Sequence, residues 1–282
     1  MSHALVPTKL EELWACIAEN PDAMLCAGGT DLLVKIRSRS VTPDCLICME
    51  RLDDFKGVRV EAGEIIIGAL TTHRELLHDP IVQRELPILA SAVQNLGSPP
   101  IRNMGTLGGN IVTASPAGDT LAPLYILKAR LKIRSKESSR SVPIESFISG
   151  PGKVDLRTGE ILSEVVINQD SRFTVNHYEK VGRRNALACS VVSMAALMNI
   201  AEDNTISEIR LAWGSVGPTI MRFGDVELLL EGRQLTVRGI EDAIRKVQQS
   251  VSPIDDTRAS ADYRRYVAGR LLLRLVSYAS SR

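Results

Sequence analysis

Two segments with paired glycines constrain this chain more than any other feature of its sequence. The first reads LCAGGTDLL and contains Gly28 and Gly29, and the second reads GTLGGNIVTASPAGD and contains Gly108 and Gly109. Paired glycines let backbone N–H groups approach a phosphate, because no Cβ atom stands in the way. Taken alone, the first segment is also typical of a tight turn between a strand and a helix.

The second segment makes a nucleotide site the better explanation for both. Neither segment has the G-x-G-x-x-G or G-x-x-x-x-G-K-[ST] spacing, which disfavours a Rossmann dinucleotide site and a P-loop. The second segment adds an amide at Asn110, hydroxyls at Thr113 and Ser115, and a carboxylate at Asp119. The two segments together can supply a cradle for a diphosphate, with the carboxylate accepting ribose hydroxyls. The sequence therefore predicts a site for a large dinucleotide.

Composition and charge exclude several other classes of protein. The chain has 282 residues, 44% of them hydrophobic, and its formal net charge is only +1, so no overall field favours nucleic acid or an anionic membrane. No signal peptide or membrane span is evident, and we expect the protein in the cytoplasm. The five cysteines are an odd number in apolar surroundings, typical of reduced thiols. The CLIC pair lacks a second pair or a nearby histidine, so we expect no metal site.

The first part of the chain alternates helical and strand patterns. Thr8 with Glu11, and Thr72 with Glu75, have the form of capping boxes and predict helix starts. The first of these helices is expected to end at Glu19. The runs AMLCA and CLICM predict strands, and GVRVEAGEIIIGA predicts a β-hairpin turning at its Ala-Gly pair. The 23 residues of GSPPIRNMGTLGGNIVTASPAGD predict a long functional loop.

The last part of the chain is organised differently. The polar run NQDSR, residues 168–172, predicts a domain boundary. Beyond it, three apolar runs predict a meander of three long strands, and helical spacing predominates from Phe223 onward. We therefore expect an α+β fold, in which a larger α/β part precedes a C-terminal cap of strands and helices.

Four quoted motifs resemble one known family over essentially the full length of the chain. AGGTDL, IRNMGTLGGNIVTASPAGD, GEIL and YEKVGRR are similar to the FAD-binding subunit, or medium chain, of the molybdenum hydroxylases, which include xanthine and carbon monoxide dehydrogenases. The resemblance implies a two-part α/β FAD-binding domain of the PCMH type, formed by residues 1–55 and 56–170. Residues 171–282 would form the C-terminal flavoprotein cap, with a three-stranded antiparallel sheet and a helical bundle.

The resemblance also implies one FAD per chain and assigns its contacts. The first glycine segment would run along the diphosphate and the ribityl chain, and the second would clamp the phosphates through the hydroxyl of Thr106 and the N–H groups of Gly108 and Gly109. The implied cofactor-binding residues are Met24, Leu25, Cys26, Ala27, Gly28, Gly29, Thr30, Asp31, Thr106, Leu107, Gly108, Gly109, Asn110, Asp119, Leu162 and Lys180.

Three of these residues would lie away from the phosphates. Asp119 matches a carboxylate on the adenosine side, Leu162 matches an apolar residue lining the flavin pocket, and Lys180 matches a lysine close to the isoalloxazine ring. An ammonium there would raise the reduction potential of the flavin. Leu96 stands where animal xanthine oxidoreductases place an aromatic residue near the flavin.

The resemblance implies an electron-transfer subunit without catalytic or metal-binding residues of its own. Molybdopterin would sit on a large partner subunit and two [2Fe–2S] clusters on a small one. NAD⁺ is favoured as the electron acceptor, with oxygen and a quinone as open alternatives. A xanthine or purine dehydrogenase type is favoured. Two alternatives are open: a stand-alone flavin oxidoreductase of the wider FAD fold, and a non-catalytic nucleotide-binding subunit.

Overall fold

The computed structural model describes residues 3–170, 173–184 and 187–279, and the chain forms two compact units built from interleaved segments. Unit 1 comprises Met1–Gln83, Ser98–Ala114 and Lys128–Gln169, and unit 2 comprises Arg84–Gly97, Ser115–Leu127 and Asp170–Arg282. The predicted boundary run includes residues 171–172, which lie outside the described residues. The three-domain division of the sequence remains a prediction.

Unit 1 begins with a small parallel sheet, in which the strands lie in the order β1-β3-β2. Helices provide both connections, because parallel neighbours need a crossover rather than a tight turn. Leu13 and Trp14 of the first helix pack in a buried cluster with Ile47 of β3. The elements are β1 (His3–Leu5), α1 (Leu10–Glu19), β2 (Met24–Cys26), α2 (Leu32–Arg37) and β3 (Cys45–Cys48).

Unit 1 also contains a five-stranded antiparallel sheet, in which the strands lie in the order β4-β5-β10-β6-β7. The predicted hairpin is confirmed: Ala62 and Gly63 join its strands with φ values of 49° and 79°. Two left-handed residues give the twist that a two-residue hairpin favours. The strands are β4 (Val58–Glu61), β5 (Glu64–Gly68), β6 (Arg130–Arg134), β7 (Ser139–Pro143) and β10 (Ile161–Asn168).

The segment predicted as a long loop contains two short helices instead. Ser98 caps the first, its hydroxyl accepting the N–H of Ile101, and Thr106 caps the second by accepting the N–H of Gly109. The prediction was wrong because prolines in the first turn and glycines behind a threonine cap are compatible with a helix. The other elements in this part of the chain are η1 (Asp53–Phe55), α3 (His73–His78), α4 (Pro80–Glu85), α6 (Pro99–Met104), α7 (Leu107–Thr113), α9 (Ile144–Phe147), β8 (Ile148–Gly150) and β9 (Lys153–Val154).

The two predicted capping boxes have different outcomes. Thr72 and Glu75 form one at the start of α3, with both reciprocal hydrogen bonds present. Thr8 does not cap α1; its N–H and hydroxyl donate to the carboxylate of Glu12, and the helix begins after Lys9. The end of α1 at Glu19 is as predicted.

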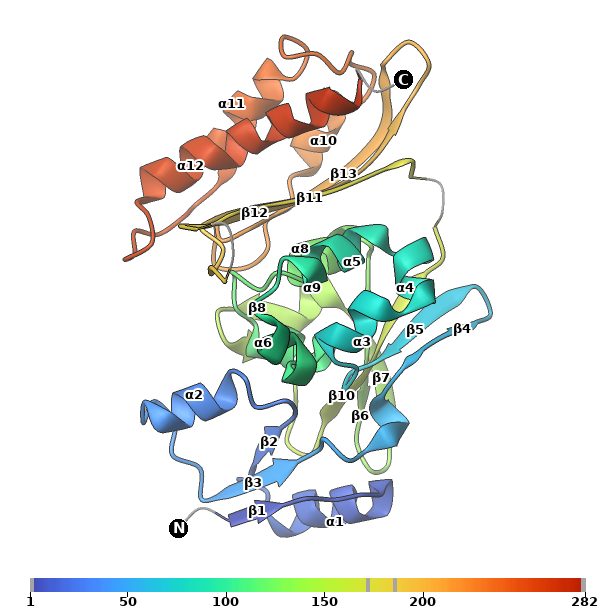
Figure 1. Cartoon of the computed structure of the whole chain (residues 1–282), viewed down its shortest axis with the longest axis vertical. Helices are drawn as coiled ribbons and strands as arrows, with labels where there is room; N and C mark the ends of the chain where they lie inside the picture. Colours follow the sequence, from blue (N-terminus) through green and yellow to red (C-terminus); the bar gives the residue numbers. More distant parts are fainter. Residues whose placement is uncertain (1–2, 171–172, 185–186, 280–282) are drawn as a thin grey trace. The chain divides into compact units, whose positions relative to one another are not determined.

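Unit 2 is a three-stranded antiparallel meander covered by helices, as predicted. Three helices cover one face of the sheet, and α5 and α8 pack on its strands as well (Figure 1). The elements are α5 (Pro87–Gln94), α8 (Leu121–Ile126), β11 (Val175–Val181), β12 (Val192–Ile200), β13 (Ile206–Gly214), α10 (Gly224–Leu230), α11 (Glu241–Ser250), α12 (Ala261–Arg270) and η2 (Leu271–Tyr278).

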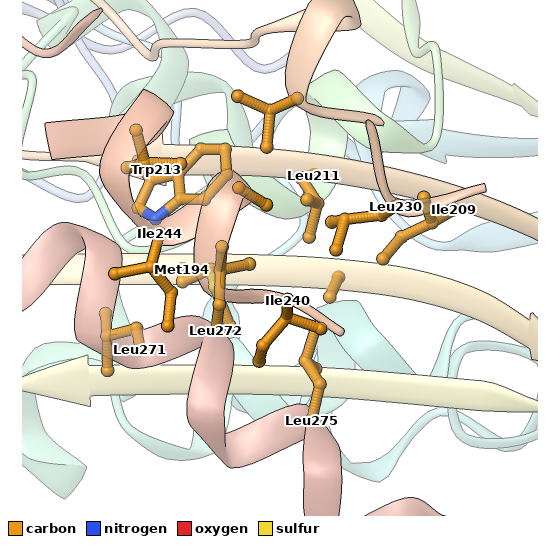
Figure 2. Close-up of a cluster of buried hydrophobic side chains, with 14 of the residues drawn as sticks. Met194, Ile209, Leu211, Trp213, Leu230, Ile240, Ile244, Leu271, Leu272 and Leu275 are labelled. Carbon is orange, nitrogen blue, oxygen red and sulfur yellow. The ribbon is translucent and has the colours of Figure 1, made fainter. Parts of the chain in front are cut away.

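The core of unit 2 lies between the sheet and the C-terminal helices. Figure 2 shows Trp213 and Leu211 of β13 gathered with Ile244 of α11 and with Leu272 of η2. The indole Nε1 of Trp213 donates to the carbonyl oxygen of Ala268 at 3.0 Å, which satisfies the one polar atom of this large buried side chain. Among the described residues, no helix is long and apolar enough to cross a membrane.

Candidate cofactor site

The first glycine segment leaves β2 and enters α2 through a turn that only a small residue permits. Gly29 has a φ of 70°, in the left-handed region that glycine enters without steric cost. Within the described part of the chain, the backbone N–H groups of Gly28, Gly29 and Thr30 have no hydrogen-bond acceptor, and neither does the Thr30 hydroxyl. Unpaired donors gathered at one turn are suited to an anion.

The second segment lies in direct backbone contact with the first. A Cβ atom on Gly28 would stand 1.6 Å from the carbonyl oxygen of Met104, and one on Gly105 would stand 3.2 Å from the hydroxyl oxygen of Thr30. The missing Cβ of Gly28 therefore makes room for protein backbone rather than for a ligand. This contact fixes where the unpaired donors of the first segment lie.

A carboxylate adds a second connection between the two segments. Asp31 accepts a hydrogen bond from the hydroxyl of Thr113 at 3.2 Å and forms an ion pair with Lys35 at 2.7 Å. Thr113 ends α7, and Lys35 lies one turn into α2. Asp31 therefore braces α2 against α7, and its carboxylate already has protein partners.

The N–H groups of Leu107, Gly108 and Gly109 in the second segment have protein acceptors, unlike those of Gly28, Gly29 and Thr30 in the first. Gly108 donates to the carbonyl of Ala69 at 2.8 Å, and Gly109 donates to the Thr106 hydroxyl at 3.1 Å. Leu107 donates to the carbonyl of Thr71 at 3.0 Å. These bonds attach the start of α7 to the chain between β5 and α3. The phosphate contacts predicted for Gly108 and Gly109 would require both groups to exchange partners.

Several predicted cofactor residues are buried in unit 1. Leu107 is fully buried, and Leu162 and Cys26 are nearly so. Met24, Leu25 and Ala27 are partly exposed beside them, and so are Gly109 and Asn110. Burial, and after it the neighbouring Cys48, raises the pKa of the Cys26 thiol to about 11. Cys26 is therefore a neutral thiol that packs against the sheet.

Asp119 and Lys180 belong to unit 2, where the structure brings them together. Lys180 Nζ lies 2.7 Å from Asp119 Oδ2 and also donates to the carbonyl oxygen of Asn95 at 3.1 Å. The hydroxyl of Tyr178 donates to Asp119 Oδ1 at 3.1 Å. Burial raises the pKa of Asp119, while Lys180 opposes that rise. The charge of Lys180 is thus balanced by a carboxylate, which weakens the potential-raising effect predicted for it.

Four groups that take part in these contacts were not predicted from the sequence. Tyr178 and the carbonyl of Asn95 complete the ion-pair cluster, and the carbonyl of Met104 supports the first segment. His73 lies against Gly105. Tyr178 could have been predicted, because side chains alternate along a strand and Tyr178 therefore lies on the same face as Lys180. No sequence signal pointed to the two carbonyl groups.

The ion pair generates a prediction about stability. We expect Lys180→Met to lower the free energy of unfolding by about 3 kcal/mol, because it leaves a buried carboxylate without its counter-charge. The side chains of both partners are only 9% exposed. The matched control is Arg245→Met, whose partners Glu241 and Asp242 are exposed and whose loss should cost less than about 0.5 kcal/mol.

Urea unfolding of the purified chain measures both effects. Adding Asp119→Asn to Lys180→Met should restore part of the loss, since the unpaired charge is then removed. Equal stability of Lys180→Met and Arg245→Met would contradict the structural importance of the pair.

Comparisons with known proteins agree on one family. The profile of the FAD binding domain in molybdopterin dehydrogenase matches residues 1–169, and that of the CO dehydrogenase flavoprotein C-terminal domain matches residues 176–279. The putative xanthine dehydrogenase FAD-binding subunit of Escherichia coli K12 is 34% identical, over 93% of this chain and 90% of that protein.

Solved structures show the same relationship. Carbon monoxide dehydrogenase from Hydrogenophaga pseudoflava matches with a TM-score of 0.92 and 30% identity, covering 99% of this chain and 97% of that chain. Quinoline 2-oxidoreductase from Pseudomonas putida 86 matches with a TM-score of 0.93 and 26% identity, again covering 99% and 97%.

The family and the α+β fold predicted from the motifs are therefore confirmed. The chain belongs to the FAD-binding subunits of the molybdenum hydroxylases, the oxidoreductase family of the xanthine dehydrogenase and carbon monoxide dehydrogenase type.

Proposed function

We propose that the first glycine segment binds the diphosphate of FAD and that the second segment holds it in position. The observation that carries this proposal is the set of donors without acceptors: the N–H groups of Gly28, Gly29 and Thr30, together with the Thr30 hydroxyl. These groups fit a diphosphate, which offers several anionic oxygens to such a loop. In the second segment, the N–H groups of Leu107 and Gly108 donate to protein carbonyls and that of Gly109 donates to the Thr106 hydroxyl, so this segment acts as support.

The remaining predicted contacts belong to the same proposal. Partly exposed Met24, Leu25 and Ala27 precede the donors and are suited to line the path of the cofactor. For Asp119, Leu162 and Lys180, the family resemblance is the support, and cofactor contact remains a prediction. Asp119 would have to share its carboxylate with the two donors that it already has.

The proposed role is electron transfer within a multi-subunit enzyme. When bound, FAD supplies two-electron redox chemistry through its flavin ring, and the chain supplies binding and orientation. We propose that a small partner subunit with [2Fe–2S] clusters delivers the electrons, that a large partner with molybdopterin oxidises the substrate, and that NAD⁺ is the acceptor. Relatives named as FAD-binding subunits and medium chains of dehydrogenases support this division of labour. Use of NAD⁺ would place the complex in the cytoplasm.

The substitution Gly28→Ala in the full chain tests whether the first glycine segment forms the proposed cradle for the FAD diphosphate. We expect FAD affinity to fall at least about tenfold, because the new methyl group collides with the Met104 carbonyl and displaces the donors. Gly150→Ala is the control, since its Cβ would meet only the Lys153 side chain at an ordinary 3.7 Å. Quenching of FAD fluorescence on titration gives both dissociation constants. Equal affinity in the two variants would contradict the proposed cradle.

Substrate and acceptor are tested on the complex isolated through a tag on this chain. We expect xanthine to reduce the bound FAD and NAD⁺ to reoxidise it, so that NADH accumulates. Flavin absorbance reports the first step and NADH absorbance the second. Reduction of FAD by xanthine without NADH formation would contradict NAD⁺ as acceptor. No reduction of FAD by xanthine would contradict the purine assignment.

A further inference from the structure

His73 occupies the junction of the two glycine segments. It is the first residue of α3, and its backbone N–H donates to the carbonyl of Gly105 at 2.9 Å. Its ring atom Cδ2 lies 3.1 Å from the point where a Cβ of Gly105 would stand, and the Thr30 hydroxyl oxygen lies 3.2 Å from the same point. The Cδ2 edge of the imidazole therefore faces the place where Thr30 of the first segment meets the second.

The imidazole is buried and uncharged. Only 3% of His73 is exposed. Burial, and after it the positive charge of Arg102, lowers its pKa to about 4, so the ring is neutral at pH 7. A neutral imidazole carries one N–H donor and one bare nitrogen acceptor.

The position of the proton follows from the surroundings of the two nitrogens. Nδ1 is buried and has no hydrogen-bond partner among the described residues. A buried N–H without an acceptor is rarer in folded proteins than an unsatisfied acceptor, which assigns the proton to Nε2. Nε2 is bonded to Cδ2 and so belongs to the edge that faces the junction. In the described part of the chain it makes no hydrogen bond either, but unlike Nδ1 it is not fully enclosed by protein.

We propose that His73 is a further FAD-binding residue, which donates from Nε2–H to an oxygen of the cofactor diphosphate, directly or through one water. The Nε2–H donor has no acceptor in the described part of the chain, and a donor on a buried ring is expected to find a partner in a bound group. An anion at the first segment would supply that partner, and the nearby positive charge of Arg102 favours the same ligand. The inference rests on the proposed cradle of the first segment.

Two substitutions separate a hydrogen-bonding role from a packing role. Phenylalanine keeps the shape of the ring without nitrogen, whereas glutamine places an amide N–H close to the position of Nε2. We expect His73→Phe to weaken FAD binding by about tenfold, the equivalent of one hydrogen bond to a charged group. We expect His73→Gln to stay within about threefold of the wild type. His78→Gln, at the exposed end of the same helix, is the control.

Thermal unfolding of the FAD-free chain distinguishes a binding role of His73 from a structural one. His73→Phe should keep or raise the unfolding temperature, because it removes an unpartnered buried nitrogen, and yet lose FAD affinity. Retention of wild-type affinity in His73→Phe would overturn the proposal, and so would an equal loss in both His73 variants.

Nitrogen NMR of the wild-type chain tests the contact without any substitution. The chain has four histidines, so the ring signals of ¹⁵N-histidine-labelled protein can be assigned with few variants. We expect the Nε2 signal of His73 to shift when FAD is added; an unchanged signal would overturn the proposal. If the wild type fails to bind FAD at all, the cradle itself fails, and if it binds FAD while His73→Phe binds equally well, only the role of His73 fails.

Discussion

Backbone contact between the two glycine segments is the constraint on which the candidate site depends. Gly28 meets the carbonyl of Met104 at a separation that admits no side chain, and Gly105 lies close to the hydroxyl of Thr30. Asp31 adds a bond from α2 to α7. A loop without contacts to other segments would sample many conformations, because ordering it costs conformational entropy. Here the second segment supplies the rigidity.

The second segment can act as support because the N–H groups at the start of α7 already have protein acceptors. Gly108 and Leu107 donate to carbonyls between β5 and α3, and Gly109 donates to the Thr106 cap. The first segment has the opposite character, with three N–H groups in a row left without acceptors. Unsatisfied polar groups in native proteins occur most often at functional sites. This difference between the segments is the reason for proposing that the first binds the cofactor and the second supports it.

Much of the fold was predictable from the sequence, because it follows from patterns of neighbouring residues. The meander of β11 to β13 and the hairpin at Ala62 and Gly63 follow from apolar runs and turn residues, and the box of Thr72 and Glu75 follows from helix capping. The helices α6 and α7 were missed because their prolines and glycines were read as breakers, although Ser98 and Thr106 are good caps.

The site was predictable only in part. The glycine pairs pointed to the segments on which the proposed site rests, but which N–H groups are free depends on Ala69 and Thr71, about 40 residues upstream of their donors. The neutral state of His73 and the pairing of Lys180 with Asp119 also depend on tertiary burial. No local pattern encodes such contacts.

Amide hydrogen exchange tests the central claim, that the first segment supplies the donors for FAD. The full chain would be measured by NMR with and without the cofactor. We expect the amides of Gly28, Gly29 and Thr30 to exchange rapidly without FAD and to slow markedly when it binds. Those of Gly108 and Gly109 should be protected in both states. FAD binding that leaves the first group unprotected, or that changes only the second, would contradict the account.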